Sequence, residues 1–444
     1  MNSFVVEAEH STPVIGEYDV LILGGGAAGM AAATAAARHG ASTLLVEKYG
    51  FLGGTFTAAL VCTFCGLHIL KDGKPEQIVH GIVDDFLSRL DFYDGLNSPH
   101  VVMEKTASQS FDVAAMKIVA DEIVCSAGAQ INLHTLAVGI NRKGRNIEAL
   151  IVENKNGRGA IRAKTFIDCS GDGKLGHLAG VPDLNENIEN GRQYPTMMFR
   201  VHNVDDETAI NIGTPIFNEL LVQANKSGNW SFPRTTGVLY PQHHQGEWRL
   251  NVTQVQTENG ASPNTLDAQT FTNAEIEGRR QVAEMLRFLR ENVPGFSNCY
   301  LIELPAELGV RQSRNLSGKY ILQGSQILDS SPIPFPIGIN TWPMENHVQG
   351  KISWTFPERA WHQIPMGSLV PVEVENLFVA GRCASFDSGA LSAVRVTGPC
   401  MAMGQAAGTA AALGFSSSTV LESNNYDKLK QVLIDDGVTL FFQD

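Results

Sequence analysis

The stretch that decides the fold is "YDVLILGGGAAGM", residues Tyr18 to Met30. Its apolar run predicts a buried strand, which leads through a glycine-rich turn into the alanine-rich helix "GMAAATAAARH". Gly24 permits the tight turn, Gly26 lets the backbone approach a pyrophosphate, and Gly29 lets the helix pack close to the strand. Strand, turn and helix in this order predict a dinucleotide site, with the pyrophosphate at the N-terminus of the helix.

The next predicted strand, "STLLVEK", carries an acidic residue at the spacing that such a site needs. Glu47 lies 47 − 24 = 23 residues after the first glycine, where an acid is expected roughly 20 residues on. Its carboxylate can accept hydrogen bonds from ribose hydroxyl groups, so we predict that Glu47 binds the cofactor. Ala27 and Ala28 of the turn and Lys48 beside the acid are included in this predicted site.

Composition excludes several other classes of protein. The chain has 444 residues, enough for two or three structural units, and its net charge of −13 argues against nucleic acid or an anionic membrane as a partner. No stretch approaches the roughly 18 consecutive apolar residues of a membrane span. The N-terminus has no secretion-signal pattern and the seven cysteines are thinly spread, so we expect a cytoplasmic protein with reduced thiols. Residues 1–13 are polar and unpatterned and are expected to form a flexible tail.

A second glycine pair in "KYGFLGGTFTAAL" indicates which dinucleotide is bound. Here the chain resembles FAD-dependent oxidoreductases of the glutathione-reductase-like superfamily. In that superfamily the segment after the acidic strand runs along the pyrophosphate and the ribityl chain. The resemblance implies FAD as the cofactor, with contacts from Gly53, Gly54 and Thr55.

The resemblance continues through the first half of the chain. The superfamily uses a strand to place backbone near the adenine, here around Leu136 to Val138, which includes Ala137. Two further predicted strands, "IEALIVEN" and "AIRAKTFIDCS", complete a β-meander. The following "SGDGKLGHLAG" is similar to the D-x-[ST]-G-D-G signature that closes the first FAD-binding block, which implies cofactor contacts from Gly171 and Asp172.

The C-terminal part carries the more specific resemblance. The strand "NLFVAG" implies that Gly381 and Arg382 reach the ribityl side of the flavin, and a long helix of small residues is predicted to start near Gly398. The N–H groups at its start can stabilise negative charge on a reduced flavin. Together with "LGVRQSRNLSGKY", this segment looks like a group of bacterial FAD-dependent oxidoreductases that mostly lack an assigned substrate.

We therefore expect an α/β protein with a Rossmann-like FAD-binding domain, built on a parallel sheet and a β-meander, and an inserted α+β substrate domain. The composition changes near residues 185 and 357, so the FAD-binding domain is predicted at 14–184 and 358–444 and the substrate domain at 185–357. A predicted helix in this insertion, "EIEGRRQVAEMLRFLREN", is expected to pack through one face. The residues assigned to that face are Ile276, Val282, Met285, Leu286 and Leu289.

The predicted activity is hydride transfer between a carbon of a small-molecule substrate and flavin N5. The sequence has no second G-x-G-x-x-G unit, so an external electron acceptor or donor is expected: oxygen, a quinone or a partner protein. One alternative is a flavin-binding protein without turnover, acting as a sensor or an assembly component. Another is a dithiol-linked reductase that uses Cys62 and Cys65. Their spacing differs from the C-x₄-C pair that superfamily disulfide reductases place directly after the glycines, which favours two buried structural thiols.

Arginines are the candidate substrate-binding residues. Arg395 lies three residues before Gly398, and its permanently charged guanidinium can clamp a carboxylate or carbonyl oxygen over the flavin. Arg311 and Arg314 of "GVRQSR" are its candidate companions, so the substrate is expected to carry an anionic or carbonyl group. Among the histidines, His362 is the first candidate for a catalytic base because it precedes the flavin-proximal strand.

The chain departs from the resembled group at three positions. Relatives often carry "IPYRSL" where this chain has "IPMGSL", so Gly367 stands where they have an arginine. They often have a histidine where Ser388 stands, and Gln312 replaces an acid. A proton-transfer role of that histidine cannot be carried over to this chain.

Overall fold

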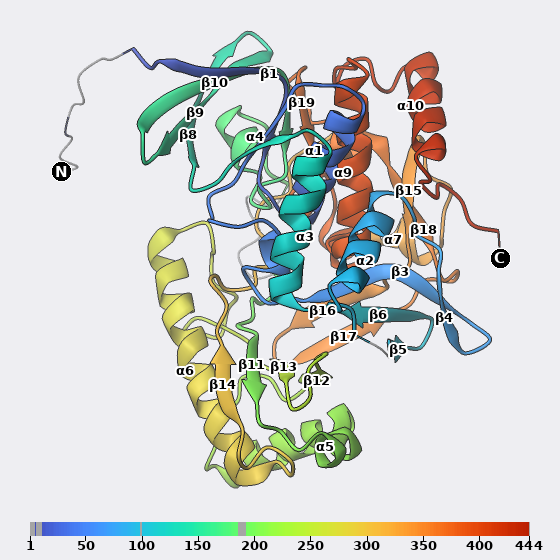
Figure 1. Ribbon diagram of the computed structural model, residues 1–444. Helices are drawn as coiled ribbons and strands as arrows, with labels where there is room; N and C mark the ends of the chain where they lie inside the picture. Colours follow the sequence, from blue (N-terminus) through green and yellow to red (C-terminus); the bar gives the residue numbers. More distant parts are fainter. Residues whose placement is uncertain (1–4, 6–10, 98–99, 185–191, 444) are drawn as a thin grey trace.

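The computed structural model describes residues 5, 11–97, 100–184 and 192–443. Figure 1 shows an upper part built around one large sheet and a lower part that contains α5 and α6. Most of the tail expected at residues 1–13 lies outside the described residues.

The large sheet contains the strands predicted around the glycine turn. Its order is β7-β2-β1-β10-β9-β8, and β19 also pairs with β10. β1 is parallel to β2 and β10, whereas β10, β9 and β8 form an antiparallel meander. All four residues of β2 are buried, as expected for a parallel strand that is covered on both faces. The predicted parallel sheet with a β-meander is confirmed. Its strands are β1 (Val14–Leu23), β2 (Thr43–Val46), β7 (Gln130–Asn132), β8 (Leu136–Lys143), β9 (Asn146–Asn154), β10 (Gly157–Asp168) and β19 (Leu377–Val379).

Two helices of small residues pack against each other beside this sheet: α1 (Ala27–Arg38) and α9 (Thr397–Ala412). Gly404 and Gly408 of α9 face the backbone carbonyls of Ala28 and Ala32 in α1 so closely that a side chain at either glycine would collide. The close packing brings the C-terminal segment next to the glycine turn, which is far away in the sequence (Figure 1).

Smaller antiparallel sheets and short helices complete the upper part. One sheet has the order β4-β3-β6-β5, and two further sheets have two strands each, β15 with β18 and β16 with β17. The strands are β3 (Thr63–Lys71), β4 (Lys74–Gln77), β5 (Val101–Met103), β6 (Thr106–Ser110), β15 (Pro336–Asn340), β16 (Met344–Val348), β17 (Lys351–Thr355) and β18 (His362–Pro365). The helices are α2 (Ile82–Phe92), α3 (Val113–Ser126), α4 (Lys174–Leu178), α7 (Gly324–Leu328), α8 (Ser388–Val394) and α10 (Ser423–Asp435), with short 3-10 turns at Gly54–Phe56 and Met366–Leu369.

The lower part has its own hydrophobic core, which runs from Met197 to Leu308. Buried residues after it, such as Leu316 and Ile337, belong to the core of the upper part. The division into domains stays a prediction, and we propose from these cores that the inserted domain ends near residue 308 instead of 357. Its elements are β11 (Phe199–His202), α5 (Asp206–Ser227), β12 (Val238–Pro241), β13 (Trp248–Asn251), α6 (Ala268–Asn292) and β14 (Tyr300–Glu303).

The predicted packing face of α6 is correct in part. Val282, Met285 and Leu289 are buried, but Ile276 is 58% exposed, so its assignment to this face was wrong. Ile276 precedes Met285 by nine residues, about two and a half turns of helix, and therefore points to the opposite side. The first turns of α6 instead bury Ala274 and Gly278.

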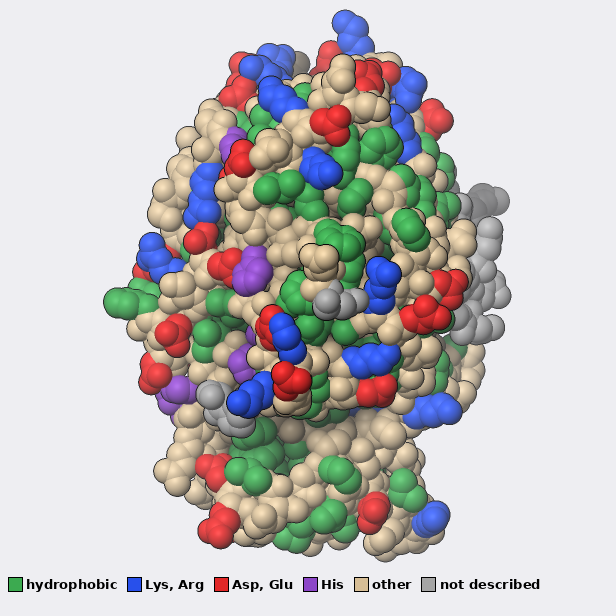
Figure 2. Space-filling view, turned by 90° about the vertical axis from the view of Figure 1, so that its right-hand side faces the viewer, with side chains coloured by type: hydrophobic (Ala, Val, Ile, Leu, Met, Phe, Trp, Pro, Cys, Tyr) green, Lys and Arg blue, Asp and Glu red, His purple; other side chains and the backbone are tan. Residues whose placement is uncertain are grey.

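The surface carries no large patch of one sign on the face shown in Figure 2, where basic and acidic side chains are interspersed. No helix in the described part of the chain is long and apolar enough to cross a membrane.

Candidate functional site

The glycine turn lies between the end of β1 and the start of α1. Gly24 has a φ of +101°, and a Cβ there would lie 2.5 Å from the carbonyl oxygen of Cys169, so only glycine fits. Gly26 has an ordinary φ of −74°. A Cβ at Gly26 would meet only the Cα of Gly54, at 3.8 Å. The space above Gly26 is therefore open at the N-terminus of a helix, where backbone N–H groups favour an anion.

The second glycine pair packs directly against this turn. The N–H of Gly53 donates to the carbonyl of Gly25 at 2.8 Å. A Cβ at Gly54 would lie 2.8 Å from the Cα of Gly26. Thr55, the next residue, is exposed. The two segments that the sequence assigned to the cofactor thus form one continuous backbone wall.

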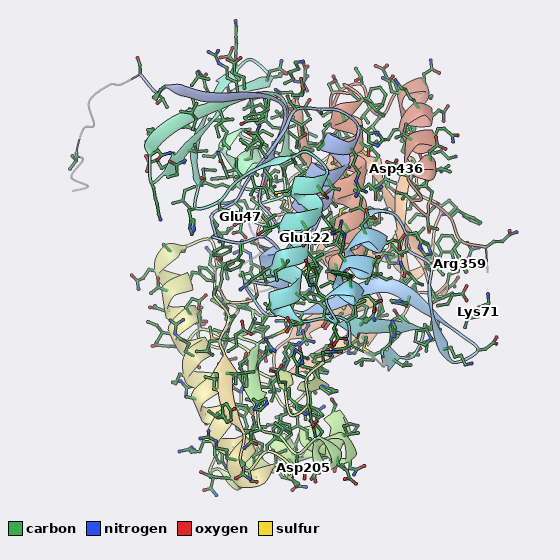
Figure 3. All side chains as sticks on the ribbon, in the orientation of Figure 1. Glu47, Lys71, Glu122, Asp205, Arg359 and Asp436 are labelled. Atoms are coloured by element: carbon green, nitrogen blue, oxygen red, sulfur yellow. The ribbon has the colours of Figure 1, made fainter. Side chains whose placement is uncertain are left out.

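Glu47 is buried at the end of the strand that follows α1, and Figure 3 labels it within the upper part. Its Oε2 accepts from the N–H of Gly25 at 2.6 Å, and its Oε1 accepts from the N–H of Tyr49 at 3.0 Å. The carboxylate therefore holds the glycine turn in place. Its bond to a ribose stays a prediction, as does the cofactor contact of Lys48, which forms an ion pair with Glu307.

Three distant segments meet on the other side of the turn. Arg382 follows β19 and forms a 2.9 Å ion pair with Asp172, which follows β10, and it also donates to Ser313 Oγ at 2.6 Å. Burial acts to raise the pKa of Asp172, but the charge of Arg382 and the bond from Ser313 outweigh it and lower this pKa. Gly171 lies against the same guanidinium. The structure thus brings these predicted cofactor residues together.

The remaining predicted cofactor residues lie in the loop after β19, at the start of α9 and on β8. Gly381 packs against Ala28 of α1, where a Cβ on the glycine would lie 3.2 Å from the Cβ of Ala28. Gly398 is the second residue of α9, where a Cβ would lie 2.8 Å from the carbonyl oxygen of Gly66 in β3. Ala137 lies on β8 of the meander, opposite Val152. Their contacts with the cofactor stay predictions.

These features fit a bound dinucleotide: an open backbone at a helix N-terminus, a second backbone wall and a buried acid at the end of the second strand. A family model described as FAD-dependent oxidoreductase matches residues 19–433. The chain belongs to this family. This FAD-dependent oxidoreductase therefore uses the cofactor that the sequence predicted.

The individual relatives of this oxidoreductase are distant. A digeranylgeranylglycerophospholipid reductase of Picrophilus torridus is 27% identical over 176 residues, 38% of this chain and 43% of the relative. The enzyme of the same name from Thermoplasma volcanium is 23% identical over 50% of this chain and 54% of the relative. The matches thus span about half the length of these curated relatives.

Among solved structures, the chain matches a geranylgeranyl bacteriochlorophyll reductase-like protein of Thermoplasma acidophilum. It is 16% identical, with a TM-score of 0.48, over 95% of this chain and 83% of that chain. An anhydrotetracycline hydroxylase of Streptomyces rimosus is 12% identical, with a TM-score of 0.43, over 94% of this chain and 67% of that chain.

Two of the three predicted substrate arginines lie in one cluster, Arg311 buried and Arg395 largely buried. Arg395 lies between α8 and α9, and its guanidinium is 3.6 Å from Glu345 Oε2. Arg311 is 7% exposed and donates to the carbonyl of Tyr194 at 2.6 Å. Burial and the nearby charge of Arg395 lower the pKa of Arg311. Arg314 lies elsewhere, where it donates to the carbonyl of Asp172 at 3.2 Å.

The same buried cluster contains residues that the sequence analysis missed. Arg234 is 2% exposed and lies 3.5 Å from His347, which in turn bonds Glu345 at 2.8 Å. Burial lowers the pKa of His347 well below its ordinary value, so the ring is neutral. Glu345 and His347 alternate along β16, and this period of two is the one local signal that could have indicated a shared face. Arg234 lies in a loop without any such pattern.

The three departures from the resembled group have structural counterparts. Gln312 Nε2 donates to Ser388 Oγ at 3.2 Å, so two of these positions face each other as a neutral pair. At Gly367, a Cβ would lie 2.7 Å from the Cβ of Tyr320, so a side chain would require the backbone to move.

His362 is buried on β18, where its Nε2 lies 3.1 Å from the side-chain nitrogen of Asn340. Burial lowers its pKa to about 3.

Cys62 is fully buried, and burial raises its pKa to about 12; burial likewise raises the pKa of Cys65. Neither thiol forms a disulfide. These thiols are therefore protonated at neutral pH and poor nucleophiles.

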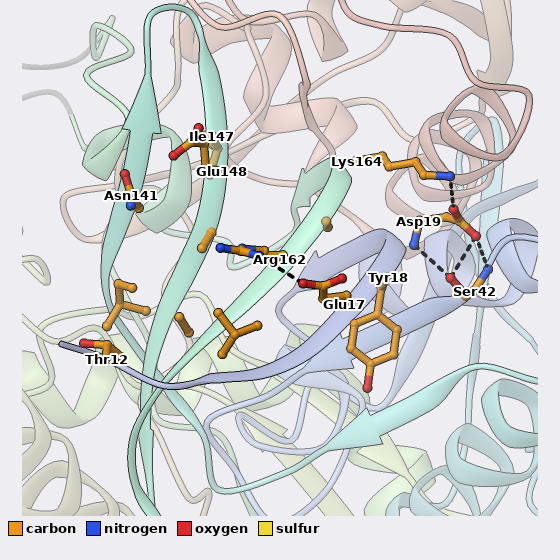
Figure 4. A pocket seen from close by; sticks show the side chains of 15 residues that line it. Thr12, Glu17, Tyr18, Asp19, Ser42, Asn141, Ile147, Glu148, Arg162 and Lys164 are labelled. Atoms are coloured by element: carbon orange, nitrogen blue, oxygen red, sulfur yellow. Dashed lines mark hydrogen bonds and ion pairs between the residues drawn. The ribbon is translucent and has the colours of Figure 1, made fainter.

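A shallow pocket on the outer side of the meander lies away from these groups (Figure 4). Four of its charged side chains pair with one another: Arg162 with Glu17 at 3.1 Å and Lys164 with Asp19 at 2.7 Å. We assign no ligand to it.

Proposed function

We propose that this oxidoreductase transfers hydride between a carbon of a small anionic organic molecule and N5 of FAD. FAD supplies the hydride acceptor or donor, and the protein supplies binding, orientation and electrostatics. The observation that carries the proposal is that Arg311, which is buried, and Arg395, whose side chain is 11% exposed, share one cluster next to the start of α9.

Arg395 is the residue best placed to orient a substrate. It ends α8 and precedes the first turn of α9, the element expected to face the flavin. A guanidinium offers several fixed donors and matches a carboxylate through two parallel hydrogen bonds. Glu345 contacts Arg395 through both its backbone carbonyl, at 3.3 Å, and its carboxylate, at 3.6 Å. Glu345 therefore positions this side chain.

Proton transfer by His362 is not part of the proposal. A base must remain accessible and must protonate near the working pH, whereas His362 is 4% exposed and has a pKa of about 3. Cys62 and Cys65 are also left out, because their raised pKa values keep both thiols protonated. The chain's own contribution is thus to bind and orient the substrate and to stabilise charge.

Electron exchange with the second substrate is proposed to use an external acceptor or donor, because the chain has one G-x-G-x-x-G unit. A cytoplasmic location is proposed because the seven cysteines are thinly spread, as is typical of proteins that keep their thiols reduced. The names of the curated relatives suggest a prenyl-chain reductase as a second candidate. A long prenyl chain needs an apolar lining, and the guanidinium, carboxylate and imidazole groups around Arg395 favour a small anion.

The proposal is tested by anaerobic stopped-flow mixing of the flavin-loaded protein with a panel of small organic acids, both before and after photoreduction. At least one acid should change the redox state of the flavin. In Arg395→Lys, flavin content should be retained and the rate should fall tenfold or more, since losing a charged two-point contact costs about 1.5–3 kcal/mol.

The matched control is Arg279→Lys, an exposed arginine on α6 that pairs with Glu275. It should leave the rate unchanged. An unchanged rate in Arg395→Lys, or a flavin that exchanges electrons with no organic acid, would contradict the proposal.

A further inference from the structure

The arginine cluster holds more positive charge than its own carboxylate can neutralise. Arg234, Arg311 and Arg395 come from three separate segments, and the pKa of Arg311 is lowered first by burial and then by the charges of the other two. Glu345 is the one acidic side chain that forms an ion pair with any of them among the described residues. With a neutral His347, the cluster has a net charge of about +2, because arginine stays charged in proteins.

Arg311 and Arg234 are held by neutral acceptors. Arg311 donates to the carbonyl of Tyr194 at 2.6 Å and lies 3.4 Å from Asn251 Oδ1. Arg234 donates to the backbone carbonyl and, at 3.1 Å, to the side-chain oxygen of the same Asn251. The buried Nε atoms of Arg234 and Arg395 have no hydrogen-bond partner in the described structure. The cluster therefore has unused donors as well as unbalanced charge.

The carboxylate of Glu345 already has three partners. Its carboxylate accepts from Trp342 Nε1 at 3.1 Å and contacts His347 Nε2 at 2.8 Å, in addition to Arg395. These partners hold it on β16. Among the residues that the structure describes, its single charge therefore leaves two guanidinium groups of the cluster without a counter-ion.

A fourth buried arginine, Arg249, lies outside this cluster. It lies opposite Arg200 in the pairing of β11 with β13. Arg200 has three acidic neighbours, Asp112 at 3.7 Å, Glu247 at 2.6 Å and Glu303 at 2.8 Å. Those three carboxylates pair with Arg200. Arg249 itself donates to neutral acceptors, Thr63 Oγ1 at 2.6 Å and the carbonyl of Leu60 at 3.4 Å, and it is not counted in the cluster around Arg311.

A buried charge without a counter-ion is costly, and proteins normally pair it. We propose that the substrate of this oxidoreductase is a small dicarboxylate, whose two charges balance Arg234 and Arg311 while Arg395 orients it. Guanidinium forks match carboxylates in a planar, two-point geometry, and two carboxylates supply the two negative charges that the cluster lacks. This inference rests on the proposed function, because it places the substrate at the same arginines.

The first experiment measures binding to the flavin-loaded wild-type protein by calorimetry, at one ionic strength. The probes are succinate, butyrate and methyl phosphate. We expect succinate to bind at least tenfold more tightly than butyrate, and more tightly than methyl phosphate. Equal affinities for succinate and butyrate would overturn the inference, and so would preferential binding of methyl phosphate.

The second experiment uses Arg311→Gln and Arg234→Gln, in which an amide keeps a donor but removes the charge. Each should weaken succinate binding tenfold or more and change butyrate binding less, while Arg279→Gln on α6 should change neither. If both cluster variants keep the preference of the wild type for succinate, the inference is wrong. If a variant does not fold, the affinities of the wild-type protein for succinate, butyrate and methyl phosphate decide.

Failure of the proposed function gives a different result. Tight succinate binding by the wild type, together with a flavin that no dicarboxylate reduces or reoxidises, would leave the dicarboxylate site standing and would remove hydride transfer from it.

Discussion

Replacing Gly26 with alanine separates cofactor binding from folding at the glycine turn. The φ of −74° at Gly26 suits any residue, and a Cβ would have one neighbour, the Cα of Gly54 at 3.8 Å. The free energy of unfolding of the flavin-free protein should therefore change by no more than about 0.5 kcal/mol, as at an unstrained surface site. The added methyl group occupies the space through which a pyrophosphate approaches the backbone.

The loss of one charge-assisted hydrogen bond to the backbone costs about 1.5–3 kcal/mol. The dissociation constant for FAD should therefore rise by roughly 10- to 150-fold. Flavin fluorescence during titration of the flavin-free protein measures this constant, and urea unfolding of the same sample measures its stability.

Gly54→Ala is the matched control, because it changes the facing residue. Gly54 has a φ of +53°, and its Cβ would lie 2.8 Å from the Cα of Gly26. Strain of this kind costs about 1–3 kcal/mol, so this variant should lose stability even without flavin. The reasoning is refuted if Gly26→Ala binds FAD like the wild type, or if its flavin-free form is destabilised as much as Gly54→Ala.

Two further predictions concern buried side chains. Cys62→Ala and Cys65→Ala should keep the rate of flavin reduction, because both thiols are protonated at neutral pH; a flavin-coupled loss of two thiols on oxidation of the wild type would contradict this. His362 has a folded-state pKa of about 3 against an ordinary 6.5, so the unfolded chain binds more protons between these values and stability falls as the pH falls through this window. The difference corresponds to at most about 4–5 kcal/mol, since one pKa unit is about 1.36 kcal/mol. Urea unfolding at pH 7 and pH 4 should show a smaller loss in His362→Gln than in the wild type, and equal losses would count against it.

The cofactor and the main sheet could be predicted from the sequence because their signals are local. Gly24, Gly26 and Glu47 lie within one strand–helix–strand unit, in which the spacing of residues along the chain determines which groups meet. The structure keeps this order: Glu47 accepts a hydrogen bond from the N–H of Gly25 at 2.6 Å. The second glycine pair was predictable through its resemblance to known flavoproteins. Gly54 lies so close to Gly26 that a side chain there would collide, which is the physical reason for a glycine at this position.

The prediction from hydrophobic periodicity was wrong at one position of α6, because the direction of its buried face was misassigned. The sequence indicated an amphipathic helix over residues 275–292, and α6 is there, but Ile276 lies on its exposed side. Burial along a helix depends on which neighbours cover each turn, and those neighbours come from other elements.

The charge balance of the candidate substrate site was decided by tertiary structure alone. Arg234, Arg311, Glu345 and Arg395 are separated by 34 residues or more, and no local pattern relates them. Sequence analysis selected Arg311 and Arg395 but also Arg314, which the fold directs to Asp172. Spacing along the chain determines which groups meet only within one turn or one βαβ unit. Across longer separations the packing of α9 on α1, and of the inserted core on the first, sets which charges are buried together.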